Sequence, residues 1–132
     1  MIKFTKITKA LEEIAETCKK NKSIEACGFL GFDYTDKKYV VQHEKNCSIN
    51  PKEEFRINSF NFLMFKKNFS IAAIFHSHIL GSFLTSDFDE DSSENCCVPF
   101  LIYSLNEDKF DIYQPKNIEY DVSIFKKIKE NI

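Results

Sequence analysis

Two histidines, a serine and an aspartate are the residues of this sequence whose types and spacing could carry chemistry. His76 and His78 directly follow the apolar run of residues 71–75, whose β-branched and aromatic side chains predict a buried strand. Side chains two residues apart on a strand share a face, so both imidazoles should point to the same side. After seven intervening residues, Ser86 and Asp89 stand three apart. That spacing would place them on one face at the start of a helix.

Two neutral imidazole nitrogens and one carboxylate are a ligand set typical of catalytic zinc, in which the fourth tetrahedral position stays open. The segment between the pairs contains Gly81 and Ser82, which favour a loop. If this loop folds back, Asp89 and Ser86 both face the histidines. The pattern therefore predicts a zinc ion held by His76, His78 and Asp89.

Each half of the pattern also has a purely structural interpretation. A His-x-His pair alone is weak evidence for a metal, and Ser-x-x-Asp equally fits a helix capping box. Alternating aspartates at positions 87, 89 and 91 resemble the start of a calcium-binding loop. That loop needs glycine where this sequence has Ser92 and a bidentate glutamate where it has Val98, so we exclude it.

The complete pattern resembles that of the JAMM family of zinc metalloproteases, also called the MPN or JAB domain: an early glutamate, then His-x-His-x(7)-Ser-x-x-Asp. The matching positions are Glu25, His76, His78, Ser86 and Asp89. The resemblance extends over about residues 20–114 and includes the segments EACGFLGF, NCSINPKEEFRIN and VPFLIYSL. One position departs from the pattern, because Ile79 stands where most members have a proline that would fix the backbone of the loop.

The resemblance implies a single JAMM/MPN-type (cytidine-deaminase-like) α/β (α+β) domain over residues 1–132, acting as a zinc-dependent metallopeptidase. A zinc ion held by His76, His78 and Asp89 would lower the pKa of a bound water. Glu25 would then be the general base and Ser86 the oxyanion donor. The implied substrate is an amide or isopeptide bond, for example at the C-terminal tail of a ubiquitin-like protein.

Two alternative functions stay open. Members of this fold that lack the ligands act as non-catalytic binding or scaffold modules in larger assemblies. A second branch occurs in phage tail-assembly proteins, and the segments EACGF and NCCVPFLIYSL resemble that branch as well as the small prokaryotic members. Metal content and hydrolysis would distinguish an enzyme from a scaffold.

Composition narrows the function classes further. A chain of 132 residues with 43% hydrophobic residues, 14 of them Phe, is large enough for one packed core. The net charge of -2 and the scattered lysines argue against a nucleic-acid partner. No apolar run approaches the roughly 20 residues that span a bilayer, and the N-terminus lacks a signal-peptide core. We therefore expect a cytoplasmic protein with no membrane partner.

Five cysteines, an odd number without any Cys-x-x-Cys pair, predict reduced thiols rather than a disulfide framework or a thiolate zinc site. A thiol nucleophile, Cys27 with His43 as its base, is an alternative catalytic pair. Otherwise His43 is expected to be an ordinary hairpin residue.

The elements that must position these residues form a mixed α+β order. Helical periodicity predicts helices over residues 7–20, 60–67 with Ser59 as N-cap, and 87–95. Apolar or alternating runs predict strands over residues 1–6, 25–32, 37–44, 55–57, 99–105 and 109–114, besides the histidine strand. The C-terminal segment favours a weak strand at 118–124 and a basic helix at 125–132. We therefore expect a mixed, curved sheet flanked by helices, with Glu25 at the mouth of a central strand.

Overall fold

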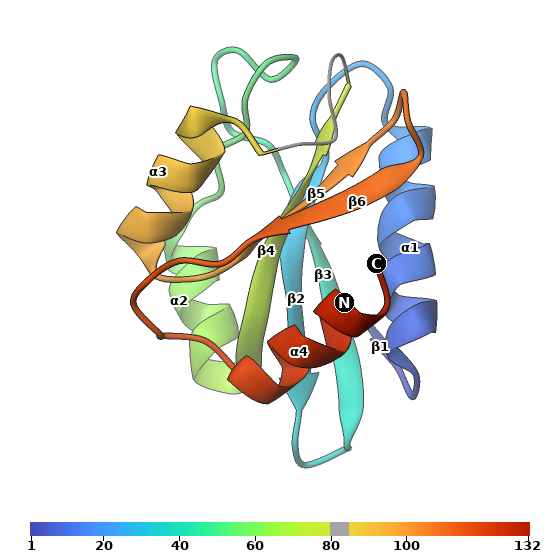
Figure 1. Ribbon diagram of the computed structural model, residues 1–132, viewed down its shortest axis with the longest axis vertical. Coiled ribbons are helices and arrows are strands. Elements are labelled where there is room, and N and C mark those ends of the chain that lie inside the picture. The colour runs from blue at the N-terminus through green and yellow to red at the C-terminus, as the bar shows by residue number, and fades with distance from the viewer. Residues whose placement is uncertain (80–84) are drawn as a thin grey trace.

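The computed structural model describes residues 1–79 and 85–132, and within them the predicted α+β architecture is confirmed as a six-stranded mixed sheet with four helices (Figure 1). The strands are β1 (Ile2–Phe4), β2 (Cys27–Asp33), β3 (Lys38–Glu44), β4 (Ser70–His78), β5 (Phe100–Ser104) and β6 (Lys109–Tyr113). The helices are α1 (Ile7–Lys20), α2 (Ser59–Asn68), α3 (Asp87–Cys96) and α4 (Val122–Glu130). The predicted loop containing Gly81 and Ser82 lies outside the described residues.

The strands are ordered β1-β3-β2-β4-β5-β6, and β4 pairs in parallel with β5 while the other neighbours are antiparallel. Strand β4 thus runs through the middle of the sheet and is buried from Ile71 to Ser77. Its neighbour β2 approaches closely at Gly28, where an added Cβ would lie 2.2 Å from the Gln42 carbonyl oxygen and 2.5 Å from the Phe75 ring. Only glycine fits there, so Gly28 lets the strand that follows Glu25 pack tightly beside the histidine strand.

Helices cover both faces of the sheet, with α2 and α3 on one side and α1 on the other (Figure 1). Alternation along the strands sends Leu30, Phe75 and Leu101 into a core with α1 and α4. The opposite residues, among them Phe29 and Ile74, form a second core with α2. His76 follows Ile74 by two residues, so it belongs to the α2 and α3 face.

The helix boundaries follow local signals. The buried residues of α1 recur at helical spacing, which is why the sequence predicts this helix to its ends; they are Ile7, Ala10, Leu11, Ile14 and Cys18. The predicted N-cap of α2 was wrong by one residue. Asn58, not Ser59, caps the helix, and its side chain accepts the backbone N–H of Asn61 at 3.2 Å.

Two predicted strands are absent from the described structure. Residues 55–57 are irregular, because the segment makes one backbone pairing, from the Cys47 N–H to the Arg56 carbonyl at 2.8 Å, rather than a ladder. Residues 118–124 are also not a strand. Asp121 instead caps α4 by accepting the N–H of Ile124 at 3.0 Å, so the helix begins at Val122.

Among the described residues, the four helices are all too short or too polar to cross a lipid bilayer.

Candidate metal centre

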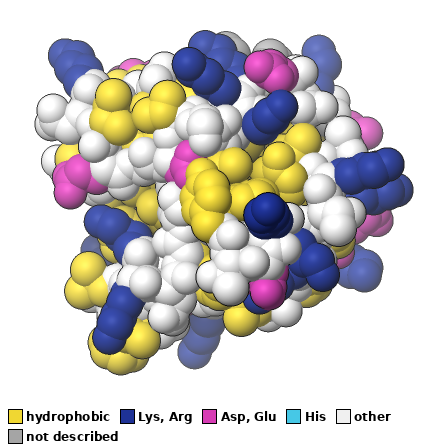
Figure 2. Space-filling view, turned by 90° about the horizontal axis from the view of Figure 1, so that it is seen from below, with side chains coloured by type: hydrophobic (Ala, Val, Ile, Leu, Met, Phe, Trp, Pro, Cys, Tyr) yellow, Lys and Arg dark blue, Asp and Glu magenta, His cyan; other side chains and the backbone are white. Residues whose placement is uncertain are grey.

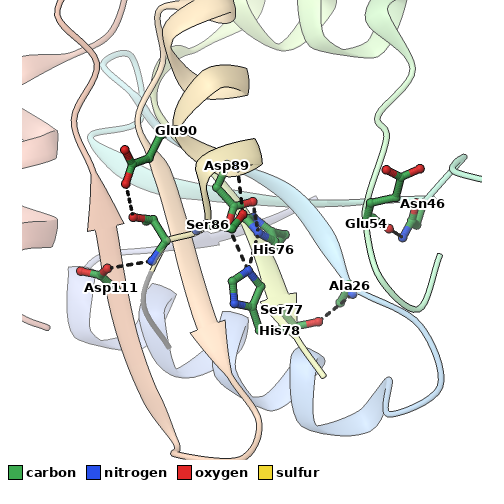
Figure 3. Close-up of polar contacts among 11 residues, drawn as sticks. Ala26, Asn46, Glu54, His76, Ser77, His78, Ser86, Asp89, Glu90 and Asp111 are labelled. Carbon is green, nitrogen blue, oxygen red and sulfur yellow. Dashed lines mark hydrogen bonds and ion pairs between the residues drawn. The ribbon is translucent and has the colours of Figure 1, made fainter. Parts of the chain in front are cut away.

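The predicted ligands converge where β4 ends and α3 begins. The Nε2 atoms of His76 and His78 lie 3.2 Å apart. Asp89 presents Oδ1 to His76 Nε2 at 3.0 Å and Oδ2 to His78 Nε2 at 3.1 Å (Figure 3). Figure 2 shows the opposite end of the molecule, where no histidine side chain of the described residues is visible. Four potential ligand atoms, two imidazole nitrogens and two carboxylate oxygens, therefore meet at the C-terminal end of β4.

The donor set fits a small cation. Zinc bonds of about 2.0–2.1 Å in tetrahedral geometry imply ligand atoms about 3.3 Å apart. The two nitrogens lie 3.2 Å apart, and each lies 3.0 or 3.1 Å from a different oxygen of Asp89. Protons can also satisfy part of this cluster, because an Nε2–H group on each imidazole would donate to one Asp89 oxygen. Lone pairs on both nitrogens and on the carboxylate instead suit one shared positive charge.

The electrostatic environment of the site also favours the protonation states in which His76 and Asp89 can bind a metal. Burial lowers the pKa of His76 against the opposing effect of Asp89, which favours the neutral imidazole that binds metals. Burial alone would raise the pKa of Asp89. Hydrogen bonds from His76 and His78, together with the N–H of Ser86, outweigh it and hold that pKa well below the usual range. Asp89 is therefore ionised at neutral pH although it is 3% exposed.

Ser86 and Asp89 form the capping box that the sequence allowed, and the same box faces the histidines. Ser86 Oγ accepts the backbone N–H of Asp89 at 3.1 Å, while Asp89 Oδ2 accepts the backbone N–H of Ser86 at 3.0 Å. The motif is therefore a helix cap whose carboxylate also faces the two histidines. The cap orients the carboxylate toward the imidazoles.

Glu25 reaches the site through strand register. Cys27 pairs with His76 across the β2–β4 ladder, and the same antiparallel register carried two residues further sets Glu25 opposite His78. Ser77 extends the pairing beyond β2: its N–H donates to the Ala26 carbonyl at 2.9 Å, and its Oγ accepts the Ala26 N–H at 2.8 Å. A residue far from the histidines in sequence is therefore fixed beside them.

The environment of Glu25 suits proton transfer. Glu25 is only 6% exposed. Burial raises the pKa of its carboxyl group to about 8. The negative charges of Asp89 and Glu54 also raise this pKa, and His78 opposes them. A carboxylate whose pKa lies near neutral pH can both accept and return a proton.

Asn46 anchors the irregular segment of residues 46–57 against Glu25. Its side-chain amide donates to the carbonyls of Glu25 and Glu54, both at 3.0 Å. Its Oδ1 accepts the N–H groups of Ser48 at 3.0 Å and Arg56 at 3.1 Å. Sequence reasoning did not identify this role, although Asn two residues before Ser is a common signal for such a turn.

A cavity of about 300 Å³ contains most of these groups. Its lining residues are Glu25, Asn50, Glu53, Glu54, Phe55, His78, Ser86, Phe88 and Asp89. His76 lies beneath the cavity, stacked on the Phe55 ring with centroids 4.3 Å apart. All five residues of the predicted site thus meet at one place, whereas Ile79 lines a different cavity.

Two lining residues, Phe55 and Phe88, were not recognised from the sequence. The available signal for Phe88 was its position as the single apolar residue in the acidic start of α3.

The alternative pair of Cys27 and His43 is not brought together. His43 Nε2 contacts Thr17 Oγ1 at 3.2 Å and Glu13 Oε1 at 3.4 Å on the α1 side, whereas Cys27 Sγ faces the Glu44 carbonyl at 3.6 Å. Burial also raises the pKa of the Cys27 thiol to about 12, which keeps the thiolate scarce. The five cysteines are free thiols.

Comparison with known proteins adds information on the fold. No family model matches the chain, and no curated protein sequence matches it significantly. The chain is similar to the solution structure of protein DSY2949 from Desulfitobacterium hafniense, with a TM-score of 0.59 and 24% identity over 84% of this chain and 92% of that one. At this identity the likeness shows a shared fold alone.

Proposed function

We propose that this chain is a zinc-dependent metallopeptidase of the JAMM (MPN/JAB) type that hydrolyses an amide or isopeptide bond. One observation carries the proposal: the ligand atoms of His76, His78 and Asp89 all lie within 4.8 Å of one another, at a cavity that Glu25 and Ser86 also line. A helix cap alone would need Asp89 beside Ser86, but it would not need two imidazoles facing the carboxylate. The JAMM pattern in the sequence supports the same assignment.

A zinc ion bound by His76, His78 and Asp89 would supply Lewis-acid chemistry, acidifying water and polarising a carbonyl oxygen. Glu25, with its raised pKa, takes a proton from the attacking water and delivers it to the leaving amine. Ser86 Oγ accepts the Asp89 N–H and so keeps its own hydroxyl proton free to donate. From the wall of the cavity it would donate this proton to the oxyanion that develops on the scissile carbonyl.

The proposed substrate is a peptide or the C-terminal tail of a ubiquitin-like protein. Glu53 and Glu54 add negative charge to the cavity wall that contains Glu25. This charge would attract a substrate that carries cationic residues near the scissile bond. The acidic wall therefore supports a substrate that is basic around the scissile bond over an acidic one.

The test begins with metal content. Protein purified without added metal should contain close to one equivalent of zinc by mass spectrometry, and it should cleave a fluorogenic lysine-isopeptide probe. A chelator should abolish cleavage and added zinc should restore it. Protein that neither carries nor takes up zinc at micromolar concentration, and leaves the probe intact, would instead support a scaffold module.

A further inference from the structure

A second cavity, of about 200 Å³, lies on the same face of the sheet as the metal centre. Its floor is one row across three strands, because Phe29 of β2 and Phe100 of β5 both pair with Ile74 of β4. Phe62 of α2 forms part of the wall, 6.0 Å from the Phe29 ring between centroids. We call this cavity the apolar hollow.

Helix α3 supplies the opposite wall through residues four apart. Phe88, Ser92 and Cys96 form one stripe along the helix and line the hollow, while Asp89 and Ser93 on the neighbouring stripe are buried. Ser92 is the small residue between two larger ones. The hollow therefore exists because a short side chain occupies the middle of this stripe.

Two aromatic residues connect the hollow to the metal centre, since Phe55 and Phe88 line both cavities. Phe55 stacks on His76, and Phe88 directly precedes Asp89 and is 54% exposed. A chain that occupies the metal cavity therefore passes over these rings to reach the hollow.

The spacing between the metal centre and the hollow matches the side-chain repeat of an extended peptide. His76 and Ile74 lie on the same face of β4 two residues apart, which is about 6.6 Å along a strand. An extended substrate has the same two-residue repeat. With its scissile carbonyl at the metal centre, a side chain two residues away would lie over the row of Phe29, Ile74 and Phe100.

We propose that the apolar hollow is a specificity subsite that receives a bulky apolar side chain, of the leucine or phenylalanine kind, two residues from the scissile bond of a peptide substrate. This inference rests on the proposed function. Among the described residues that line the hollow only Arg56 is charged, and Arg56 is exposed, so the interior favours hydrocarbon over a polar side chain.

The experiment uses fluorescein-labelled Gly-Ser peptides carrying one phenylalanine or leucine, moved one position at a time across the scissile bond. Binding is measured by fluorescence polarisation on the metal-free full chain, and cleavage on the zinc-loaded protein. We expect one position, two residues from the scissile bond, to improve both binding and kcat/KM by about 10- to 100-fold over the Gly-Ser peptide. Equal values at all positions would overturn the subsite.

Variants distinguish binding of the apolar side chain in the hollow from nonspecific hydrophobic binding of the peptide. Ser92→Phe should fill the cavity and remove the positional preference. Ser59→Phe fills it from the exposed rim on α2 and gives the same test if Ser92→Phe does not fold. Phe60→Ala is the matched control, since Phe60 lies on α2, is 66% exposed and does not line the hollow. A preference that survives filling, or that Phe60→Ala removes, contradicts the proposal.

The outcomes also separate the two proposals. Zinc-dependent cleavage without any positional preference would overturn the subsite and leave the metallopeptidase standing. Position-selective binding by a protein that cleaves no probe when loaded with zinc would support the subsite as a peptide-binding groove and overturn the peptidase.

Discussion

Ser86 and Asp89 hold each other by two reciprocal hydrogen bonds, of 3.1 and 3.0 Å, and the carboxylate oxygen that accepts from Ser86 also lies 3.1 Å from His78 Nε2. The start of α3 is therefore both a helix cap and one side of the metal centre. A substitution in the box should act on stability and on chemistry, and the two effects can be separated.

Replacing Ser86 by alanine should cost about 1 kcal/mol of folding free energy through the lost cap and lower kcat by about 10²-fold or more through the lost oxyanion donor. Asn58→Ala is the matched control, because Asn58 caps α2 with the same kind of side-chain hydrogen bond and does not line the metal cavity. Chemical denaturation and kcat measure the two effects. Equal loss of kcat in both variants would assign Ser86 a purely structural role.

Replacing His78 by alanine should abolish high-affinity zinc binding, because two of three protein ligands rarely hold the ion in competition with buffer. Isothermal titration with zinc measures the loss directly. His43→Ala should bind zinc like the unaltered protein, since His43 contacts Thr17 and Glu13 on the other face of the sheet. Undiminished zinc binding by His78→Ala would remove His78 from the ligand set.

Replacing Glu25 by glutamine should leave zinc binding intact and reduce kcat by about 10²- to 10⁴-fold, the usual contribution of a general base. Glu13→Gln serves as control, because Glu13 contacts His43 on the other face of the sheet. The measurements are zinc stoichiometry and kcat on the isopeptide probe. Cleavage by Glu25→Gln at the unaltered rate would exclude Glu25 as the base.

The metal-free protein should lose stability as the pH rises from about 6.5 to 8. Burial raises the pKa of Glu25 from 4.5 to about 8, so the folded chain keeps a proton that the unfolded chain has released. Stability falls with pH wherever the folded state binds more protons, here by about 1–2 kcal/mol between pH 6.5 and 8. Most of the opposing titration of His76, whose lowered pKa makes stability rise with pH, lies below about pH 6.5.

Glu25→Gln removes this titrating group, so its stability should stay flatter than that of the unaltered chain between pH 6.5 and 8. Denaturant unfolding in the presence of a chelator gives both curves. Parallel curves would show that Glu25 is ionised at neutral pH in the folded, metal-free protein.

Local periodicity accounts for what could be predicted about the elements. α1 was predicted to its ends because its buried residues recur at helical spacing along one face. The predictions failed at residues 55–57 and 118–124, where short apolar runs resemble strands. Phe55 in fact packs on His76, and Asp121 caps α4. A short apolar run shows hydrophobic character, but it does not show that a neighbouring strand is present to pair with the segment.

By itself, the sequence determined the identity of the chemical groups and the pairs that local geometry brings together. His76 and His78 share a face because side chains on a strand alternate, and Ser86 and Asp89 meet because residues three apart on a helix are neighbours. Only the tertiary structure decided that these two pairs, together with Glu25, meet at one cavity. Long-range strand register places Glu25 opposite His78, and burial raises its pKa. Both depend on contacts between segments far apart in the chain, which local spacing does not encode.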